Sequence, residues 1–152
     1  MRNLYDYSSK VTAGDIEALI ADGAKVDHPN DRGFTSLMMA SCFGYEGAAE
    51  ALLIAGANIN AQDKQGNTAL MLACYGGQTS AVRFLLEHGA DPLITDNDSN
   101  TCVQAVKTSP GLQDDVVDNI LQLLSDHGVA VTTRGTDLPY YKGIPIPFGL
   151  AA

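Results

Sequence analysis

The sequence predicts an all-α solenoid of about four stacked helix-turn-helix repeats, with hairpin-like loops and an extended C-terminal tail. The first observation is a 33-residue period, in which Gly33-Phe34-Thr35-Ser36-Leu37 returns as Gly66-Asn67-Thr68-Ala69-Leu70. The second is a Gly-Ala pair that begins at positions 23, 56 and 89. A repeat of this length buries its apolar face only against its neighbours, and such arrays act by presenting a surface. We therefore expect a binding protein.

Size and composition fit one folded domain. The chain has 152 residues, of which 45% are hydrophobic and 18% are charged, so it has enough apolar side chains for a core. No run approaches the ~20 apolar residues of a membrane span, and the first residues lack the layout of a secretory signal. The sequence thus leads us to expect a cytoplasmic protein.

The charge balance is acidic, with 18 Asp and Glu against 9 Lys and Arg. This balance disfavours nucleic-acid binding, which needs cations on phosphates. The excess is concentrated in the last third of the repeats, where Lys107 faces Asp91, Asp96, Asp98, Asp114, Asp115, Asp118 and Asp126. Two interpretations stay open: a solvated face that keeps the protein soluble, or a face that attracts a basic partner.

The opening unit, residues 1–29, is predicted to be partial. Ala13 to Ala24 matches the second half of a repeat, but it is about one helical turn short. Its two bounding glycines lie 9 residues apart, whereas those of the next unit lie 12 apart. End repeats are commonly atypical because one of their faces meets water.

The two regular units span residues 30–62 and 63–95. In each, a turn-rich tip precedes a threonine, Thr35 or Thr68, whose hydroxyl is expected to cap the first helix. One face of that helix carries apolar and small residues, which are Leu37 and Ala40 in one unit and Leu70, Ala73 and Cys74 in the other. Glycines then end the helix, at Gly44 and at Gly76-Gly77.

The second helix of each regular unit ends in a leucine pair. In the unit 63–95 we expect this helix over Ser80 to Glu87, and Asp91-Pro92 then starts an extended exit because proline cannot continue a helix. The predicted buried stripes are Leu52 and Leu53 in one unit and Val82, Leu85 and Leu86 in the other.

These residues carry a family resemblance. The chain resembles the ankyrin repeat over roughly residues 12–132. At the 33-residue period it shows Gly-x-Thr-x-Leu, then Ala, then Gly, then Leu-Leu-x-x-Gly-Ala. The usual Thr-Pro-Leu-His core is altered to Thr35-Ser36-Leu37-Met38 and Thr68-Ala69-Leu70-Met71. Methionine in place of histidine exchanges a polar link between repeats for adaptable apolar packing. Neither change conflicts with the fold.

The fourth unit, residues 96–132, completes a repeat domain over residues 1–132 and is predicted to carry an insertion around Ser109 to Gln113. Its closing glycine lies 39 residues after the previous one, six more than the period. The extension 133–152 belongs to no repeat and is rich in proline and aromatic residues, so we expect an extended path. This tail either packs over the last repeat as a cap or is offered to a partner as a peptide.

No catalytic motif is present, so we expect neither an enzyme nor a cofactor. His88 and His127 each precede a repeat-ending glycine, near a helix C-terminus, which favours a structural role. The odd count of three cysteines, Cys42, Cys74 and Cys102, indicates reduced thiols.

Asp96 to Asn100 alternates oxygen ligands like the start of a calcium loop. The turn glycine of such a loop is missing, and Lys107 stands where a closing glutamate is needed. We favour a polar hairpin tip in which Ser99 replaces the glycine, and we expect no metal site.

The resemblance implies that the loop tips and the exposed side of the first helices line a concave groove for a partner. Phe34, Phe43 and Tyr75 are candidate anchors, because aromatic residues often dominate interfaces, although a tip aromatic can also pack on its neighbour. Carried over by position, the candidate contact residues are Asp31, Arg32, Phe34, Phe43, Lys64, Gln65, Asn67, Tyr75, Asn97, Asp98 and Asn100.

The resulting hypothesis is a monomeric protein–protein interaction module that binds and inhibits one partner through its groove, as a toxin-immunity protein or an enzyme inhibitor would. A small array with no appended domain is suited to occluding or tethering. The alternative is a scaffold or effector adaptor that docks on a cellular protein without blocking it.

Overall fold

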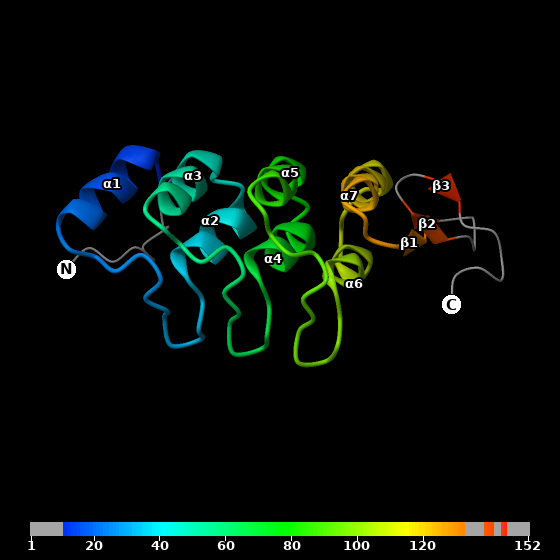
Figure 1. The fold of residues 1–152 in the computed structure, drawn as a ribbon, viewed down its shortest axis with the longest axis horizontal. Helices are drawn as coiled ribbons and strands as arrows, with labels where there is room; N and C mark the ends of the chain where they lie inside the picture. The colour runs from blue at the N-terminus through cyan, green and yellow to red at the C-terminus, as the bar shows by residue number, and fades with distance from the viewer. Residues whose placement is uncertain (1–10, 133–138, 142–143, 146–152) are drawn as a thin grey trace.

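The computed structural model describes residues 11–132, 139–141 and 144–145, and within them the core is built mainly from helices. Figure 1 shows two rows of helices above a row of projecting loops. The outer row is α1 (Ala13–Ala21), α3 (Glu46–Ile54), α5 (Thr79–Glu87) and α7 (Asp114–Asp126). The inner row is α2 (Ser36–Phe43), α4 (Ala69–Tyr75) and α6 (Cys102–Thr108). Helices pack within each row and between the rows, as the prediction of stacked helix pairs requires.

The inner helices begin at threonines. The Thr35 hydroxyl oxygen accepts a hydrogen bond from the Met38 backbone N–H at 3.3 Å, and Thr68 caps α4 through Met71 at the same distance. These contacts confirm the two predicted caps. The second helix of the unit 63–95 begins at Thr79, one residue before the predicted Ser80.

The core follows the predicted stripes with one exception. The two methionines that replace the usual histidine, Met38 and Met71, are buried, in agreement with the predicted apolar packing. Leu52, Val82 and Leu85 are fully buried, and Leu86 is nearly so. Leu53 is only half-buried, so the prediction that Leu52 and Leu53 both belong to a buried stripe is wrong for Leu53. The larger buried side chains lie beside small ones such as Ala40 and Ala73, which let neighbouring helices approach closely.

The six surplus residues of the fourth unit are divided between a loop and a helix. Four of them lengthen α7, which has 13 residues against 9 in α5. The other two lengthen the link between α6 and α7, which has five residues against three between α4 and α5. The insertion was predicted for the link alone. Within the link, Leu112 lies over Gly77 of the preceding unit, where a Cβ on the glycine would collide with the leucine Cδ2.

A small antiparallel sheet follows α7. Strands β1 (Val131–Thr132), β2 (Pro139–Tyr141) and β3 (Ile144–Pro145) pair in that order, with Val131 opposite Tyr140 and Tyr141 opposite Ile144. This pairing agrees with the extended path predicted for the tail, and both β1 and β2 contact α7. The predictions for the other tail residues fall outside the described residues.

Candidate partner-binding surface

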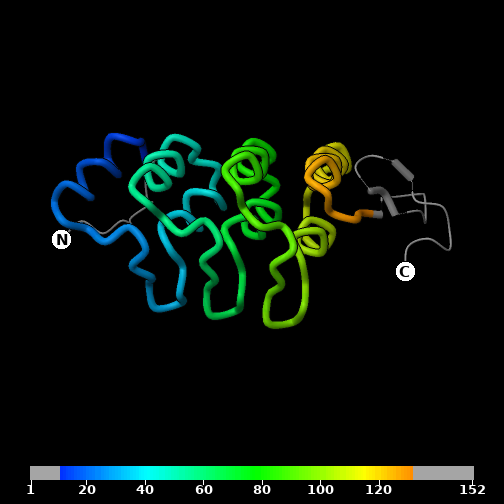
Figure 2. Tube along the Cα trace, viewed as in Figure 1, coloured from blue at the N-terminus to red at the C-terminus, as the bar shows by residue number. Residues whose placement is uncertain are grey.

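Three loop tips form a row below the helices, as the tube in Figure 2 shows. We call them tip 1 (residues 30–34), tip 2 (63–67) and tip 3 (96–100). Each tip is built on one side-chain oxygen that accepts two backbone N–H groups, which lie two and four residues further along. The acceptors are Asn30, Asp63 and Asp96, with donor–acceptor distances between 2.8 and 3.0 Å. These side chains shape the turns because a short Asn or Asp side chain can replace a backbone partner.

The tips are also joined to one another. The Lys64 backbone N–H donates to the Arg32 carbonyl oxygen at 3.3 Å, which links tips 1 and 2. The Asn97 backbone N–H donates to the Gln65 carbonyl at 2.9 Å, and its side-chain amide donates to the Lys64 carbonyl at 2.9 Å. Because these bonds run from each tip to the next, the row presents a fixed arrangement of side chains.

Glycine is required where one tip meets the next. Gly33 and Gly66 have φ angles of +82° and +85°, and a Cβ at either position would lie within 3.0 Å of backbone in the following tip. Ser99 is the equivalent residue of tip 3 and has a φ of +64°. Within the described residues tip 3 is the last of the row, and the serine meets no further tip among them. The predicted replacement of the turn glycine by Ser99 is confirmed.

The candidate contact residues divide into two groups. Those with exposed side chains are Asp31, Arg32, Phe43, Lys64, Gln65, Tyr75, Asn97 and Asp98. The half-buried ones are Phe34, Asn67 and Asn100. Phe34 packs against the hydrophobic core, with its backbone N–H bonded to Asn30. Because Phe34 packs on the core, truncating it should cost stability as well as remove a side chain from tip 1.

Two aromatic side chains stand out from the inner helices. Phe43 at the end of α2 is 51% exposed, and Tyr75 at the end of α4 is 48% exposed. The Phe43 ring lies 6.0 Å from that of Tyr45, centroid to centroid, so it is supported from one side. We call the surface made by the three tips and the exposed sides of α2, α4 and α6 the inner face.

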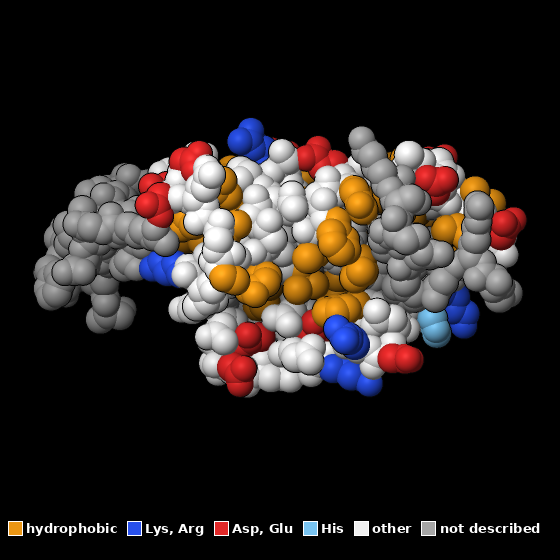
Figure 3. Space-filling model, turned by 180° about the vertical axis from the view of Figure 1, so that it is seen from behind, with side chains coloured by type: hydrophobic (Ala, Val, Ile, Leu, Met, Phe, Trp, Pro, Cys, Tyr) orange, Lys and Arg blue, Asp and Glu red, His pale blue; other side chains and the backbone are white. Residues whose placement is uncertain are grey.

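Figure 3 shows hydrophobic side chains gathered in the middle of one side of the molecule, above charged side chains at the tips. The charges differ along the row: tips 1 and 2 each hold one acid and one base (Asp31 and Arg32, Asp63 and Lys64), whereas tip 3 holds Asp96 and Asp98 without a base. Three hydrogen bonds lower the pKa of the Asp96 carboxyl. The largest effect comes from the backbone N–H of Asn100, and smaller effects come from the Asn100 side-chain amide and the Asp98 backbone N–H. Asp96 is thus ionised at neutral pH.

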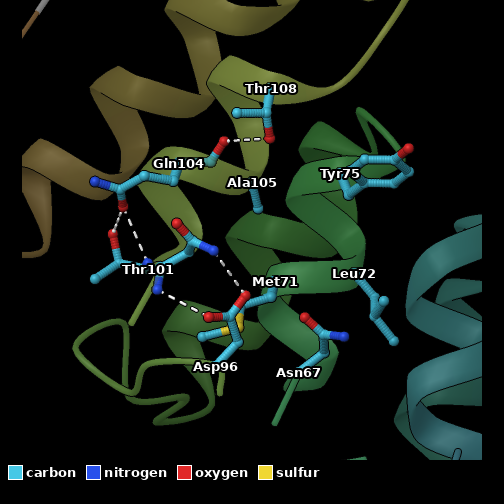
Figure 4. Close-up of a pocket in the computed structure, with 10 residues that line it drawn as sticks. Asn67, Met71, Leu72, Tyr75, Asp96, Thr101, Gln104, Ala105 and Thr108 are labelled. Carbon is cyan, nitrogen blue, oxygen red and sulfur yellow. Dashed lines mark hydrogen bonds between the residues drawn. The ribbon is translucent and has the colours of Figure 1, made fainter. Parts of the chain in front are cut away.

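A hollow of about 320 Å³ opens between α4 and α6, above tips 2 and 3. Figure 4 shows Tyr75 and Thr108 toward one end of it and Asp96 and Asn67 toward the other. The lining residues come from two successive repeats and are Asn67, Met71, Leu72, Tyr75, Asp96, Asn100, Thr101, Gln104, Ala105 and Thr108. Sequence reasoning named Asn67, Tyr75 and Asn100 but missed the hollow, because its size depends on how closely two helices pack.

The residues weighed for chemistry have structural roles. The ring Nδ1 atoms of His88 and His127 lie 2.7 and 2.8 Å from the Phe84 and Leu123 carbonyl oxygens, at the ends of α5 and α7. The Oδ1 atom of Asp96 is occupied by the turn of tip 3, in agreement with a polar hairpin tip. Within the described residues, no group of three His, Cys, Asp or Glu side chains is placed to hold a metal ion.

The paired helices, their shared core and the row of tips define a helical-repeat binding protein. A scan against protein-family models matches ankyrin repeats (three copies) over residues 10–96 and, overlapping them, 37–135. The chain therefore belongs to the ankyrin repeat family, and it is a protein–protein interaction module. A comparison with curated proteins gave no significant match. Among the described residues, no helix combines the length and apolar content needed to cross a bilayer.

Proposed function

We propose that this protein binds one protein partner through the inner face and inhibits it by covering its surface. The observation that carries the proposal is the placement of Phe43 and Tyr75, each about half exposed, on adjacent inner helices above a hydrogen-bonded row of tips. Aromatic side chains on a rigid base lose little entropy on binding and commonly dominate interfaces.

The charge pattern supports a partner with a basic region. Tip 3 contributes Asp96 and Asp98, and the whole chain carries a formal charge of −9. Opposite charges steer partners together and fix the orientation of docking. Affinity should therefore fall as salt is added, and an affinity independent of ionic strength would contradict the electrostatic part of the proposal.

The test begins with capture of partners by the tagged chain from its native cell, identified by mass spectrometry. Phe43→Ala and Tyr75→Ala should each weaken capture about tenfold, corresponding to roughly 1.4 kcal/mol. The matched control is Ile54→Ala, because Ile54 is an exposed apolar residue (79%) of the outer helix α3. Equal effects of the three variants would contradict a role for the inner face.

Inhibition is tested separately, by measuring the activity of the captured partner with and without the chain. Loss of that activity in the complex, restored by Tyr75→Ala, is the expected result. A captured partner that keeps its full activity would favour a scaffold or adaptor instead.

A further inference from the structure

We propose that the hollow between α4 and α6 receives an arginine side chain of the protein partner. This inference rests on the proposed function and names the chemistry recognised at one place on the inner face. The argument depends on which atoms at the hollow remain able to bind, on the charge they carry and on the apolar surface beside them.

The polar end of the hollow offers oxygen atoms. The side-chain N–H groups of Asn67 and Asn100 donate to the carboxylates of Asp63 and Asp96, each at 3.1 Å. These bonds orient the two amides, and within the described residues no donor is bonded to their side-chain Oδ1 atoms. Figure 4 shows the amide oxygen of Asn67 turned toward Asp96. Two neighbouring tips therefore supply acceptors to one place.

Asp96 adds a charge to these acceptors. Its Oδ1 atom accepts the backbone N–H groups of Asp98 and Asn100, whereas Oδ2 accepts, among the residues that the structure describes, the side-chain amide of Asn100 alone. A carboxylate has about four lone-pair positions, so Oδ2 can accept a further donor. The residues that line the hollow include this one carboxylate and no lysine or arginine. The hollow is therefore suited to a cation.

The remainder of the hollow suits the rest of an arginine side chain. Leu72, Ala105 and Met71 provide apolar surface on which a methylene stem can lie. Tyr75, half exposed at the other end, offers a ring face or edge to the chain that carries the arginine. Guanidinium has five N–H donors and no acceptor, in a planar fork that fits several fixed oxygens. An ammonium group is a compact point charge and uses such a set less well.

The experiment uses two small probes and the ¹⁵N-labelled full chain. N-acetylarginine amide is titrated while amide resonances are recorded, and N-acetylcitrulline amide, which has nearly the same shape without the charge, is the control. Saturable shifts of the Asn100 and Gln104 amides are expected with the arginine probe, with the citrulline probe at least about tenfold weaker. Equal binding of the two probes, or shifts scattered away from α4, α6 and tips 2 and 3, would overturn the inference.

A matched pair of variants isolates the charge. Asp96→Asn should keep the turn of tip 3, because Asn30 makes the same two backbone contacts in tip 1. It should weaken the arginine probe about tenfold. Glu50→Gln removes an exposed charge of the outer helix α3 that does not line the hollow, and it should change binding less than twofold. Equal losses in the two variants would mean that only the general acidic field acts, and would overturn the inference.

A lysine probe tests the shape of the cation. N-acetyllysine amide should bind severalfold more weakly than the arginine probe, and equal binding would overturn the assignment to arginine. The outcomes also separate this inference from the proposed function. If Asp96→Asn does not weaken partner capture and the arginine probe shifts no amide resonance, only the inference is overturned. Specific arginine binding with no partner on the inner face overturns only the proposed function.

Discussion

Replacing Gly66 by alanine tests whether contact between the tips stabilises the array. Gly66 has a φ of +85°, and an added Cβ would lie 2.8 Å from both the backbone N and the side-chain oxygen of Asn97 in tip 3. The control is Gly56→Ala: Gly56 has a φ of +94° after α3, with nothing within 4 Å of the added Cβ. Both variants place alanine in a left-handed conformation, which costs about 1–2 kcal/mol.

The difference between the two variants measures the packing of one tip on another. Crowding against backbone adds about 1–3 kcal/mol, so Gly66→Ala should lose roughly 2–5 kcal/mol of unfolding free energy and Gly56→Ala about 1–2. Urea unfolding gives both values. Hydrogen exchange at the Asn97 amide, which is bonded to the Gln65 carbonyl, should accelerate only in Gly66→Ala. Equal destabilisation within about 0.5 kcal/mol would refute the reasoning.

Three further predictions concern single side chains. Ser99→Gly should stabilise the protein by roughly 0.5–1 kcal/mol in urea unfolding, because serine is held at a φ of +64°, and a loss of stability would contradict this. A thiol reagent should label Cys42 slowly in the native protein, since burial raises the pKa of its thiol. The buried thiols of Cys74 and Cys102 should react only after unfolding. Equal labelling rates for all three thiols in the native protein would show the packing to be wrong. Asp96→Asn should make stability less sensitive to acid. The folded pKa of Asp96 is lowered, so the wild-type carboxylate stabilises the fold at pH values above its ordinary pKa. That contribution is lost as the pH falls through the lowered pKa. Parallel acid-unfolding curves of the wild type and the variant would contradict the prediction.

Much of the fold follows from local patterns that repeat. The spacing of Thr35 and Thr68 fixes where inner helices begin, and Gly44 and Gly77, both in the left-handed region, mark where they end. The acceptors that build the tips, Asn30, Asp63 and Asp96, lie on the same 33-residue period. Their spacing was a usable signal that the sequence reasoning passed over. Because a turn or cap involves residues within a few positions of each other, it can be read from one chain.

The candidate surface depends on contacts between repeats, so it was predicted less well. Phe34 and Phe43 were equivalent candidates, yet Phe34 packs on the core while Phe43 is half exposed. The fourth unit was known to be six residues too long, but the sequence did not show that four of them extend α7.

The sequence by itself determined the period, the alternation of inner and outer helices, and the row of tips, because each unit repeats the same short-range interactions. Only the tertiary structure decided which aromatic residues face solvent, why Gly66 cannot carry a side chain whereas position 99 can, and that Asp96 and Tyr75 border one hollow. Those properties arise from the distance between neighbouring units, which is set by the packing of side chains about 33 residues apart in the chain.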